Sequence, residues 1–450
     1  MDYNNNDIII ARATPIGKSA LAVIRLSGSN LEKTITAFFS KKTLTPNLMQ
    51  LKNIKAKHTG VVIDSCMVVF YKNPKSFTSE DMLEIFCHGN DHIVKNIINE
   101  FIAWGVRIAY PGEFSYRAFK NGKIDLLQAE SIASKINQNS NQYGVALQNL
   151  EEGITSQKMK ELRTSIINLQ SVIEHELDFN EEEITHLRVE EITQKFKGII
   201  VEIEQILNWS LCLQKIEQGY RVVFLGLPNA GKSTLFNRLV GVDKAIVTEI
   251  KGTTRDVLEA NIYIQGIPFV LCDTAGYRKT KHKIETLGIN KTKAMAKNAD
   301  IVVILDVKDP IHQHNIFIKD NAFLQDKQTL FVKTKCDAGV NKTKEKTIEL
   351  SCLKELGIDN LLTKLLTTVN LNLEKNNVTN IALCNMRQIN LLKQIQGVFL
   401  EALDNLNHLV EMDIVASQLQ DAAELFEELL GKMAPNEILN NIFKGFCVGK

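Results

Sequence analysis

The chain has 450 residues, which is too long for one ordinary domain and predicts about two to four. Its 44% hydrophobic and 23% charged content is typical of a globular protein with well-formed cores. The 53 basic and 52 acidic side chains leave a formal charge of +1, which excludes the global positive field of a strongly basic nucleic-acid binder. Any contact with RNA is therefore expected to be local or shared with a partner.

The cysteines and the apolar runs argue against an extracellular or membrane protein. The eight cysteines are scattered and form no Cys-x-x-Cys pair, so neither a disulfide framework nor a zinc site is indicated. The first residues lack the basic start and apolar core of a signal peptide. The apolar runs at 222–225 and 301–305 are far shorter than the roughly 20 residues of a membrane span. We expect a soluble, reduced, cytoplasmic protein that does not enter a membrane.

The first part of the chain, residues 1–123, has a mixed pattern. Residues 8–10, 21–24 and 61–63 are short apolar runs that predict strands. The stretch from His92 to Trp104 has helical spacing and is followed by Gly105, which predicts an amphipathic helix that ends there. This part is expected to form an α/β domain.

Helical spacing dominates on both sides of a central region. In residues 124–218, apolar side chains recur on one face at positions 162, 166, 169, 173 and 177, and again at 192, 196, 199, 203 and 206. Helical spacing returns in residues 372–450, for example at Leu392, Ile395 and Phe399. Each flank alone has few helices and would bury little surface. The two flanks are therefore expected to form one discontinuous helical domain.

The central region, residues 219–371, consists of strand–turn–helix units. A strand at 222–225 precedes a glycine-containing loop, and a helix from Thr234 to Val240 follows it. Residues 262–264 and 267–271 flank Gln265-Gly266, which predicts a β-hairpin. Residues 301–305 and 330–332 predict further buried strands. The expected fold class is a multidomain α/β plus α protein in which this α/β domain is inserted into the helical domain.

The loop at 226–233, Gly-Leu-Pro-Asn-Ala-Gly-Lys-Ser, has the spacing of a P-loop. Gly226 and Gly231 permit the unusual dihedrals that let N–H groups converge on phosphates at a helix N-terminus. Lys232 is expected to reach the β- and γ-phosphates, and the Ser233 hydroxyl is expected to ligate Mg²⁺.

Two motifs after the P-loop complete a phosphate and magnesium site. Asp273 ends a predicted strand and fits a Mg²⁺ role, and the N–H of Gly276 can sense the γ-phosphate. The stretch Gly252-Thr253-Thr254 lies where the first switch segment belongs, and one of its threonines is expected to complete the Mg²⁺ shell.

The base motif indicates guanine. Thr334-Lys335-Cys336-Asp337 follows the strand at 330–332, and the Asp337 carboxylate can accept hydrogen bonds from N1–H and the 2-amino group of guanine. Adenine offers neither donor. A site built to accept hydrogen bonds from such donors discriminates against an analogue that lacks them by a factor of roughly 10⁴–10⁵. The usual first residue of this motif is Asn, so this chain, with Thr334, lacks the side-chain amide at that position. Ser351, Cys352 and Leu353 fall where the last guanine-contacting loop is expected.

Hydrolysis is expected to use a monovalent cation. Ras-like GTPases orient the attacking water with a Gln directly after Asp-x-x-Gly, but Tyr277 occupies that position. Asn229 offers a neutral oxygen near the β- and γ-phosphates, where a held cation could neutralise developing charge as an arginine finger does. Glu285 is the leading local candidate for orienting the water. The alternative, that Glu285 is only a solvated residue of the switch segment, stays open. Arg278 is a further electrostatic candidate.

Outside the nucleotide motifs, the chain resembles the tRNA-modifying GTPase family MnmE, also called TrmE, essentially from end to end. The N-terminal stretches and the closing Cys-x-Gly-Lys discriminate more sharply than the nucleotide motifs, which many GTPases share. The stretches that carry the resemblance are 13–15, 23–28, 76–84, 111–114, 117–119, 121–125, 128–130, 245–256 and 447–450.

The resemblance implies a fold, cofactors and site residues. It implies an N-terminal folate-binding domain that dimerises, followed by a helical domain interrupted by a Ras-like G domain. It implies that K⁺ is held by Asn229, Thr248, Ile250 and Thr253, that Mg²⁺ is held by Ser233 and Thr254, and that Glu285 orients the water. The remaining positions implied to contact GTP are Ala230, Gly231, Lys232, Thr234, Glu249, Lys251, Gly252, Asp273, Thr274, Ala275 and Gly276.

The same resemblance implies a second site and partners. A one-carbon folate such as 5-formyltetrahydrofolate is implied to contact Arg25, Glu84, Lys123 and Lys450. Cys447 matches the near-terminal Cys of the family, which makes it a candidate catalytic thiol. Family members act as homodimers with a flavoprotein, MnmG, and modify C5 of the wobble uridine of certain tRNAs to carboxymethylaminomethyluridine.

Two other functions stay open at this stage. A ribosome-assembly or regulatory GTPase would carry a basic or aromatic RNA-binding appendage, and no strong one is visible. A folate-dependent methyl transferase gated by the G domain would need a redox partner, because the sequence contains no flavin fingerprint Gly-x-Gly-x-x-Gly.

Overall fold

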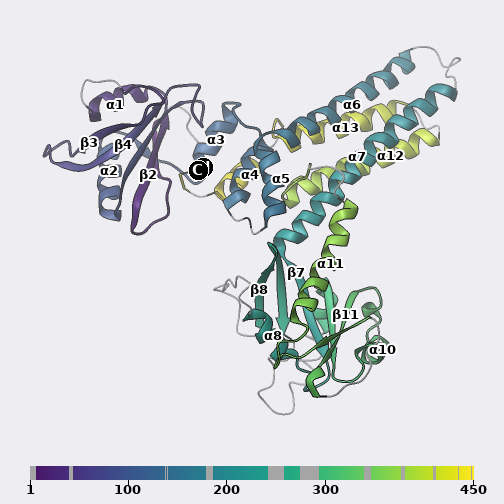
Figure 1. The fold of residues 1–450 in the computed structure, drawn as a ribbon. Helices are drawn as coiled ribbons and strands as arrows, with labels where there is room; N and C mark the ends of the chain where they lie inside the picture. Colours follow the sequence, from purple (N-terminus) through teal and green to yellow (C-terminus); the bar gives the residue numbers. More distant parts are fainter. Residues whose placement is uncertain are drawn as a thin grey trace. The chain divides into compact units, whose positions relative to one another are not determined.

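The computed structural model describes residues 7–39, 44–136, 138, 140–178, 186–241, 258–273, 293–338, 346–376, 381–408, 412–433, 435–446 and 448–449. The chain, drawn in Figure 1, is divided into two compact units. The first comprises Met1–Asn137, Leu147–Val201 and Met386–Lys450, and the second comprises Gln138–Ala146 and Glu202–Asn385. Within the described ranges, no helix combines the length and the apolar character needed to cross a membrane.

The first unit begins with a mixed sheet in the order β3-β4-β5-β2-β1-β6. Its neighbouring strands are antiparallel except for β1 and β6, which are parallel. The expected α/β character of this part is confirmed. The strands are β1 (Ile9–Arg12), β2 (Ser19–Gly28), β3 (Gln50–Lys55), β4 (Val62–Tyr71), β5 (Asp81–Gly89) and β6 (Arg107–Ile108).

Alternation along the strands divides the apolar residues between the two faces of this sheet. Ile10 and its neighbours on one face pack with residues of α1 (Leu31–Phe39) and α2 (Asp91–Ala103). Ile9 and Ala11 on the other face pack with Phe114 of α3 (Glu113–Lys120). The predicted helix at 92–104 is α2, and the Asn90 side chain caps it by accepting from the N–H of His92.

Helices from both flanks of the central region pack together in this unit. Helix α6 (Ile154–Asp178) lies against α13 (Met412–Leu430), which in turn lies against α12 (Met386–Asn407). Residues 162, 166, 169 and 173 of the predicted face of α6 are all buried. Phe196 of α7 (His186–Gln218) packs against Phe399 of α12 with the ring centroids 5.2 Å apart and the rings tilted. Helices α4 (Leu126–Ile136) and α14 (Asn436–Lys444) complete the set, and α5 (Asn141–Glu151), like α7, has residues in both units.

The second unit contains a sheet in the order β12-β11-β10-β7-β9-β8. Its central strands are continuous apolar runs, as expected for parallel strands buried on both faces. The predicted hairpin is confirmed: β8 and β9 are antiparallel, and Gln265 and Gly266 have φ of 50° and 80°. The strands are β7 (Tyr220–Gly226), β8 (Leu258–Ile264), β9 (Ile267–Asp273), β10 (Ile301–Asp306), β11 (Gln328–Thr334) and β12 (Thr347–Leu350).

The helices of the second unit that contact this sheet include α8 (Lys232–Val240), α10 (Pro310–Asp320) and α11 (Ile358–Asn376). Helix α8 begins at Lys232, two residues before the predicted start at Thr234, and ends at Gly241 as predicted. The multidomain α/β plus α fold class is therefore confirmed. The proposed boundaries 1–123, 124–218, 219–371 and 372–450 stay a prediction.

Candidate functional site

The loop between β7 and α8 has the backbone of a phosphate-binding turn. Asn229 and Gly231 have φ of 65° and 92°, in the left-handed region that favours glycine. A Cβ at Gly226 would lie 2.3 Å from the carbonyl oxygen of Leu305, so the close approach of this loop to β10 requires glycine. The loop delivers the N-terminus of α8, whose first N–H groups have no partner inside the helix. Such a terminus attracts anions.

Two side chains at the start of α8 carry the expected chemistry. The ammonium of Lys232 donates to the carbonyls of Gly226 (2.9 Å) and Leu227 (3.0 Å), which holds it over the loop. The hydroxyl of Ser233 bonds to none of the residues that the structure describes, so it is free to ligate a cation. Asn229 is exposed at the turn. These groups fit a phosphate with a divalent cation.

The segments expected to recognise the base meet at the ends of β11 and β12. These strands pair in parallel with Thr334 opposite Leu350, so the residues that follow each strand lie close together. Ser351 donates to the Asp337 carboxylate, and this hydrogen bond holds the pKa of Asp337 below its usual value of 3.8. Asp337 is exposed and stays ionised, ready to accept from a ligand.

The other residues expected on the base side differ in their surroundings. Lys335 has φ of 57° and turns the chain after β11. Thr334 is 4% exposed, and its hydroxyl donates to the carbonyl of Ala230 at 2.8 Å. Cys352 is half-buried, whereas Leu353 is 85% exposed.

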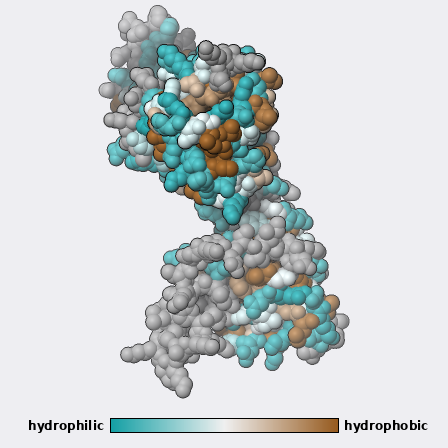
Figure 2. All heavy atoms as spheres, turned by 90° about the vertical axis from the view of Figure 1, so that its left-hand side faces the viewer, coloured by the Kyte–Doolittle hydropathy of each residue, from teal (hydrophilic) through white to brown (hydrophobic). Residues whose placement is uncertain are grey.

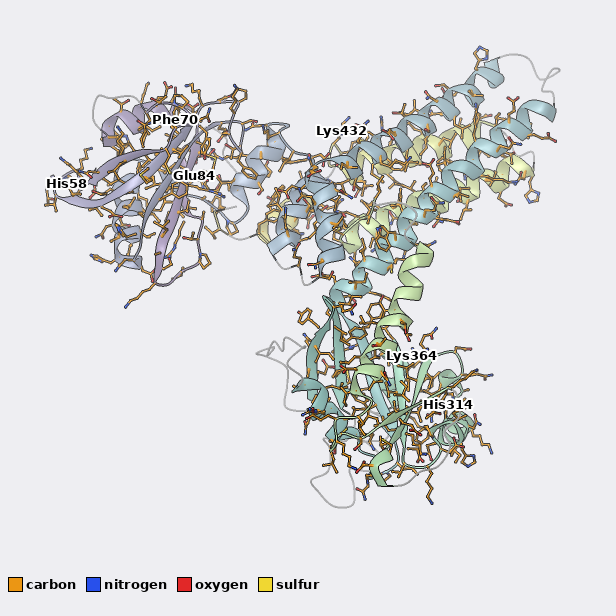
Figure 3. The ribbon with its side chains drawn as sticks, viewed as in Figure 1. His58, Phe70, Glu84, His314, Lys364 and Lys432 are labelled. Atoms are coloured by element: carbon orange, nitrogen blue, oxygen red, sulfur yellow. The ribbon has the colours of Figure 1, made fainter. Side chains whose placement is uncertain are left out.

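A second candidate site is a pocket of about 400 Å³ in the first unit, a size typical of small-molecule sites. Arg25 and Glu84 lie opposite each other on β2 and β5, and their side chains form an ion pair of 2.7 Å (Glu84 is labelled in Figure 3). The hydroxyl of Tyr71 donates to the other Glu84 oxygen at 3.4 Å. The lining residues are Arg25, Tyr71, Lys75, Ser76, Phe77, Met82, Glu84, Ile132 and Glu151.

Charge is distributed unevenly in this pocket. Arg25 pairs with Glu84, and Glu151 pairs with Lys135. Lys75 is exposed and forms no ion pair with any residue in the described ranges. Burial, with a smaller contribution from the neighbouring Glu84, raises the pKa of Tyr71, so the phenol stays protonated and can donate. The pocket therefore offers the Glu84 carboxylate at one place and an uncompensated cation at another.

The C-terminal tail approaches the same residues. The carbonyl of Gly449 accepts from the Arg25 guanidinium at 3.3 Å. Gly449 has φ of 90°, and a Cβ there would lie 2.5 Å from the carbonyl oxygen of Arg12. Only glycine fits this position, which brings the tail to the pocket residue Arg25.

Of the residues that the resemblance implied for this site, Arg25 and Glu84 come together. Lys123 is exposed and does not line the pocket. Sequence reasoning missed Tyr71, Phe77 and Lys75. The last two lie in or directly before the stretch 76–84, which was the available signal.

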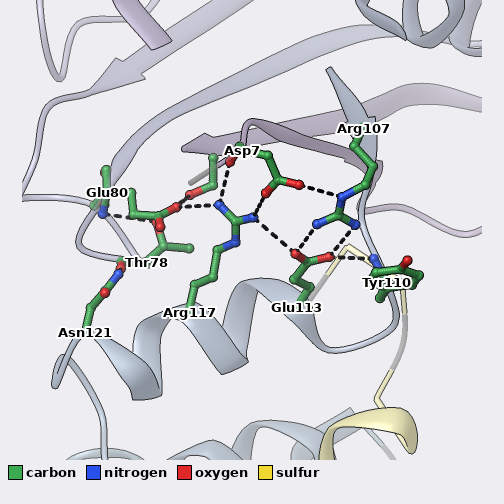
Figure 4. A network of polar contacts seen from close by, with 10 residues as sticks. Asp7, Thr78, Glu80, Arg107, Tyr110, Glu113, Arg117 and Asn121 are labelled. Carbon is green, nitrogen blue, oxygen red and sulfur yellow. Dashed lines mark hydrogen bonds and ion pairs between the residues drawn. The ribbon is translucent and has the colours of Figure 1, made fainter. Parts of the chain in front are cut away.

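A buried charge network supports the loop that lines the pocket (Figure 4). Arg117, only 1% exposed, donates to Asp7 (2.5 Å), Glu80 (3.2 Å) and Glu113 (3.1 Å). Arg107 bridges Asp7 and Glu113 from β6. Because Glu80 belongs to the segment between β4 and β5, the network ties that segment to α3.

Models of two protein families match most of the chain. The family described as GTP-binding protein TrmE N-terminus matches residues 8–123, and the MnmE helical domain matches residues 126–447. The chain belongs to the MnmE family.

Relatives from three bacteria, each named tRNA modification GTPase MnmE, align along the whole length. The protein of Aquifex aeolicus is 34% identical over 98% of this chain and 99% of its own. The MnmE of Fervidobacterium nodosum is 34% identical (100% and 99%), and that of Thermotoga petrophila is 35% identical (99% and 100%). A solved G domain of the T. maritima FeoB iron transporter covers 33% of this chain and 97% of its own at 20% identity, with a TM-score of 0.26 that adds nothing to the assignment.

Several positions that the resemblance to MnmE implies lie outside the described residues. For Asp273 only the backbone is described, at the end of β9. The positions outside are Thr248, Glu249, Ile250, Lys251, Gly252, Thr253, Thr254, Thr274, Ala275, Gly276, Arg278, Glu285, Cys447 and Lys450.

Proposed function

We propose that this chain is a K⁺-activated GTPase that works with a flavoprotein of the MnmG type. Together they convert the wobble uridine of certain tRNAs to carboxymethylaminomethyluridine, using a one-carbon unit carried by folate. The observation that carries the proposal is that a P-loop, the exposed Asp337 carboxylate and an amphiphilic pocket occur in one chain that matches MnmE proteins over its whole length. A GTPase without tRNA-modifying activity would have no use for the pocket.

The nucleotide is proposed to bind across the ends of β7 and β11. Its phosphates accept hydrogen bonds from the N–H groups at the start of α8. Lys232 turns its ammonium from the loop carbonyls to the β- and γ-phosphates. Ser233 and Thr254 are proposed to hold Mg²⁺, which neutralises charge on the phosphate oxygens. Asp337 accepts from the guanine base.

Hydrolysis is proposed to depend on K⁺ in place of an arginine finger. Asn229 supplies its side-chain oxygen from the exposed turn of the P-loop, and Thr248, Ile250 and Thr253 supply the remaining ligands. Glu285 is proposed to orient the attacking water, with Arg278 as an electrostatic contributor. This arrangement stabilises charge and positions the water without a covalent intermediate.

The pocket beside Glu84 is proposed to bind folate. A pterin edge carries a 2-amino group and ring N–H donors, which suit the acceptor oxygens of the Glu84 carboxylate. Phe77 and Met82 offer apolar surface to the ring, and Lys75 suits the negatively charged glutamate tail. Lys123, Lys450 and the thiol of Cys447 stay candidates for completing this site.

A homodimer is proposed to form through the N-terminal sheet. Strand β3 is an edge strand, and edge strands that expose apolar side chains promote association. Figure 2 shows apolar residues gathered on this end of the molecule. Around β3 the exposed ones are Leu48, Met49, Leu51, Val61 and Val62, each 44–66% exposed.

The test is reconstitution with an unmodified tRNA, GTP, K⁺, a one-carbon folate and the flavoprotein partner. Mass spectrometry of the digested tRNA is expected to show the modified uridine only when all components are present. Glu84→Ala is expected to keep GTP hydrolysis and lose the modification, whereas Lys232→Ala is expected to lose both. GTP hydrolysis without any change in the uridine would favour a regulatory GTPase instead.

A further inference from the structure

The hydroxyl of Thr334 makes a buried contact between the base-recognition strand and the phosphate loop. Thr334 is the last residue of β11, and its Oγ1 donates to the carbonyl oxygen of Ala230 at 2.8 Å. Thr334 is 4% exposed and Ala230 is 3% exposed, so water does not readily replace this bond. Strand β11 and helix α8, at whose start the loop lies, are both labelled in Figure 1.

The contact determines the direction of a phosphate donor. The carbonyl of Ala230 and the N–H of Gly231 belong to one planar trans peptide, in which the two groups point in opposite directions. Fixing the carbonyl on Thr334 therefore fixes the N–H of Gly231 on the opposite side. That N–H donates to none of the residues in the described part of the chain, so it is available to a ligand.

Steric contacts at Gly231 do not fix the orientation of this peptide. Its φ of 92° suits glycine, and a Cβ there would meet Thr334 only at 3.8 Å, an ordinary contact distance. Glycine at this position has access to several conformations, so the turn needs an outside restraint to keep one of them. The Thr334 hydroxyl supplies that restraint.

We propose that Thr334 is a positioning residue that couples base recognition to diphosphate recognition by orienting the Ala230–Gly231 peptide. The same strand end leads directly to Asp337, three residues later, which is the proposed contact for the base. A hydroxyl thus connects this strand to the phosphate loop, at a position where the side chain is usually that of Asn. The inference rests on the proposed binding of guanine nucleotides.

The test compares the affinities of GDP and GMP for the full-length protein and its variants by calorimetry. Thr334→Val keeps the shape and the strand preference but removes the donor, leaving a buried acceptor unpaired. GDP affinity is expected to fall about tenfold, within the range for such a loss. GMP lacks the β-phosphate, so its affinity is expected to change by less than about twofold.

Two further variants separate this role from a general effect on the strand. Thr334→Ser retains the hydroxyl and is expected to restore GDP affinity to within about twofold of the original. Thr329→Val makes the same substitution on β11 and is expected to leave both affinities unchanged. Among the residues that the structure describes, the Thr329 hydroxyl bonds to the nearby carbonyl of Lys327 and not to the phosphate loop. If Thr334→Val did not fold, Thr334→Ala would be measured in its place.

The outcomes distinguish the inference from the proposed function. An equal loss of GDP and GMP affinity, or no loss of either in Thr334→Val, would overturn the positioning role while the GTPase stood. Failure of the unaltered chain to bind either nucleotide would overturn both.

Discussion

At the scale of single residues, guanine selectivity is proposed to depend on the Asp337 carboxylate. Asp337→Asn is expected to weaken GTP binding about 10- to 150-fold, since hydrogen bonds to a charged group contribute about 1.5–3 kcal/mol. Binding of xanthosine triphosphate is expected to improve, because the new amide can donate to the oxygen that replaces the 2-amino group. A competition assay measures the preference, with Asp326→Asn, just before β11, as the control. An unchanged preference would rule out Asp337 as the base contact.

Also at this scale, Lys75 is expected to bind the negative tail of the pocket ligand. Because Lys75 is exposed, Lys75→Gln is expected to reduce folate affinity by only about two- to fivefold. A pterin without the glutamate tail should bind equally well to both proteins, which calorimetry can check. Lys95→Gln, on helix α2 over the other face of the sheet, serves as the control. Equal loss for both ligands would show that Lys75 does not act on the tail.

At the scale of elements, α3 is held to the N-terminal sheet by the buried Arg117. Arg117→Leu removes a cation that three carboxylates share, and one of them, Glu113, is fully buried. Removing one partner of a buried ion pair typically costs about 3–5 kcal/mol, so the free energy of unfolding of the first unit is expected to fall by that amount. Urea denaturation measures it. Lys120→Leu, on an exposed position of the same helix, is expected to change it by less than about 0.5 kcal/mol.

The same network predicts a dependence of stability on pH. Burial alone would raise the pKa of Asp7, but hydrogen bonds from Arg107 and Arg117 outweigh it and hold the pKa below 3.8. Since the folded pKa is lower than the unfolded one, the stabilisation is complete above the unfolded value of about 3.9 and is lost as the pH falls through the folded value. Urea midpoints between pH 6 and pH 2, values chosen to bracket about 3.9, are expected to fall more steeply for the unaltered protein than for Asp7→Asn. Parallel curves would contradict this role of Asp7.

At the scale of the whole molecule, the proposed catalysis uses a cation whose proposed ligands come from separate segments of the chain. K⁺ is expected to accelerate GTP hydrolysis over Na⁺ at matched ionic strength, by as much as about 10³-fold, the lower end of what an arginine finger supplies. The physical reason is that cation size must match a cage of fixed oxygens. Asn229→Ala is expected to lose this K⁺ dependence while retaining nucleotide affinity. Equal rates in the two salts would refute the proposed mechanism.

The sequence by itself determined the nucleotide loop, the base motif and the fold class. The P-loop is contiguous from Gly226 to Ser233, and its geometry follows from local backbone preferences and the helix that begins at Lys232. Asp337 and Ser351 come together because each follows a strand, and parallel strands end at the same edge of a sheet. The helical faces of α6 and α7 were visible because burial imposes a regular spacing.

Only the tertiary structure decided which side chains share the pocket and what Thr334 does. Arg25, Glu84 and Tyr71 meet through the register of three strands, and a shift of one residue would turn each side chain to the other face. No local pattern marks Lys75 as a lining residue or shows that Lys123 is not one, because loop paths depend on packing. Thr334 looked like the loss of an amide in the sequence, whereas its position beside Ala230 makes its hydroxyl the link between the two halves of the nucleotide site.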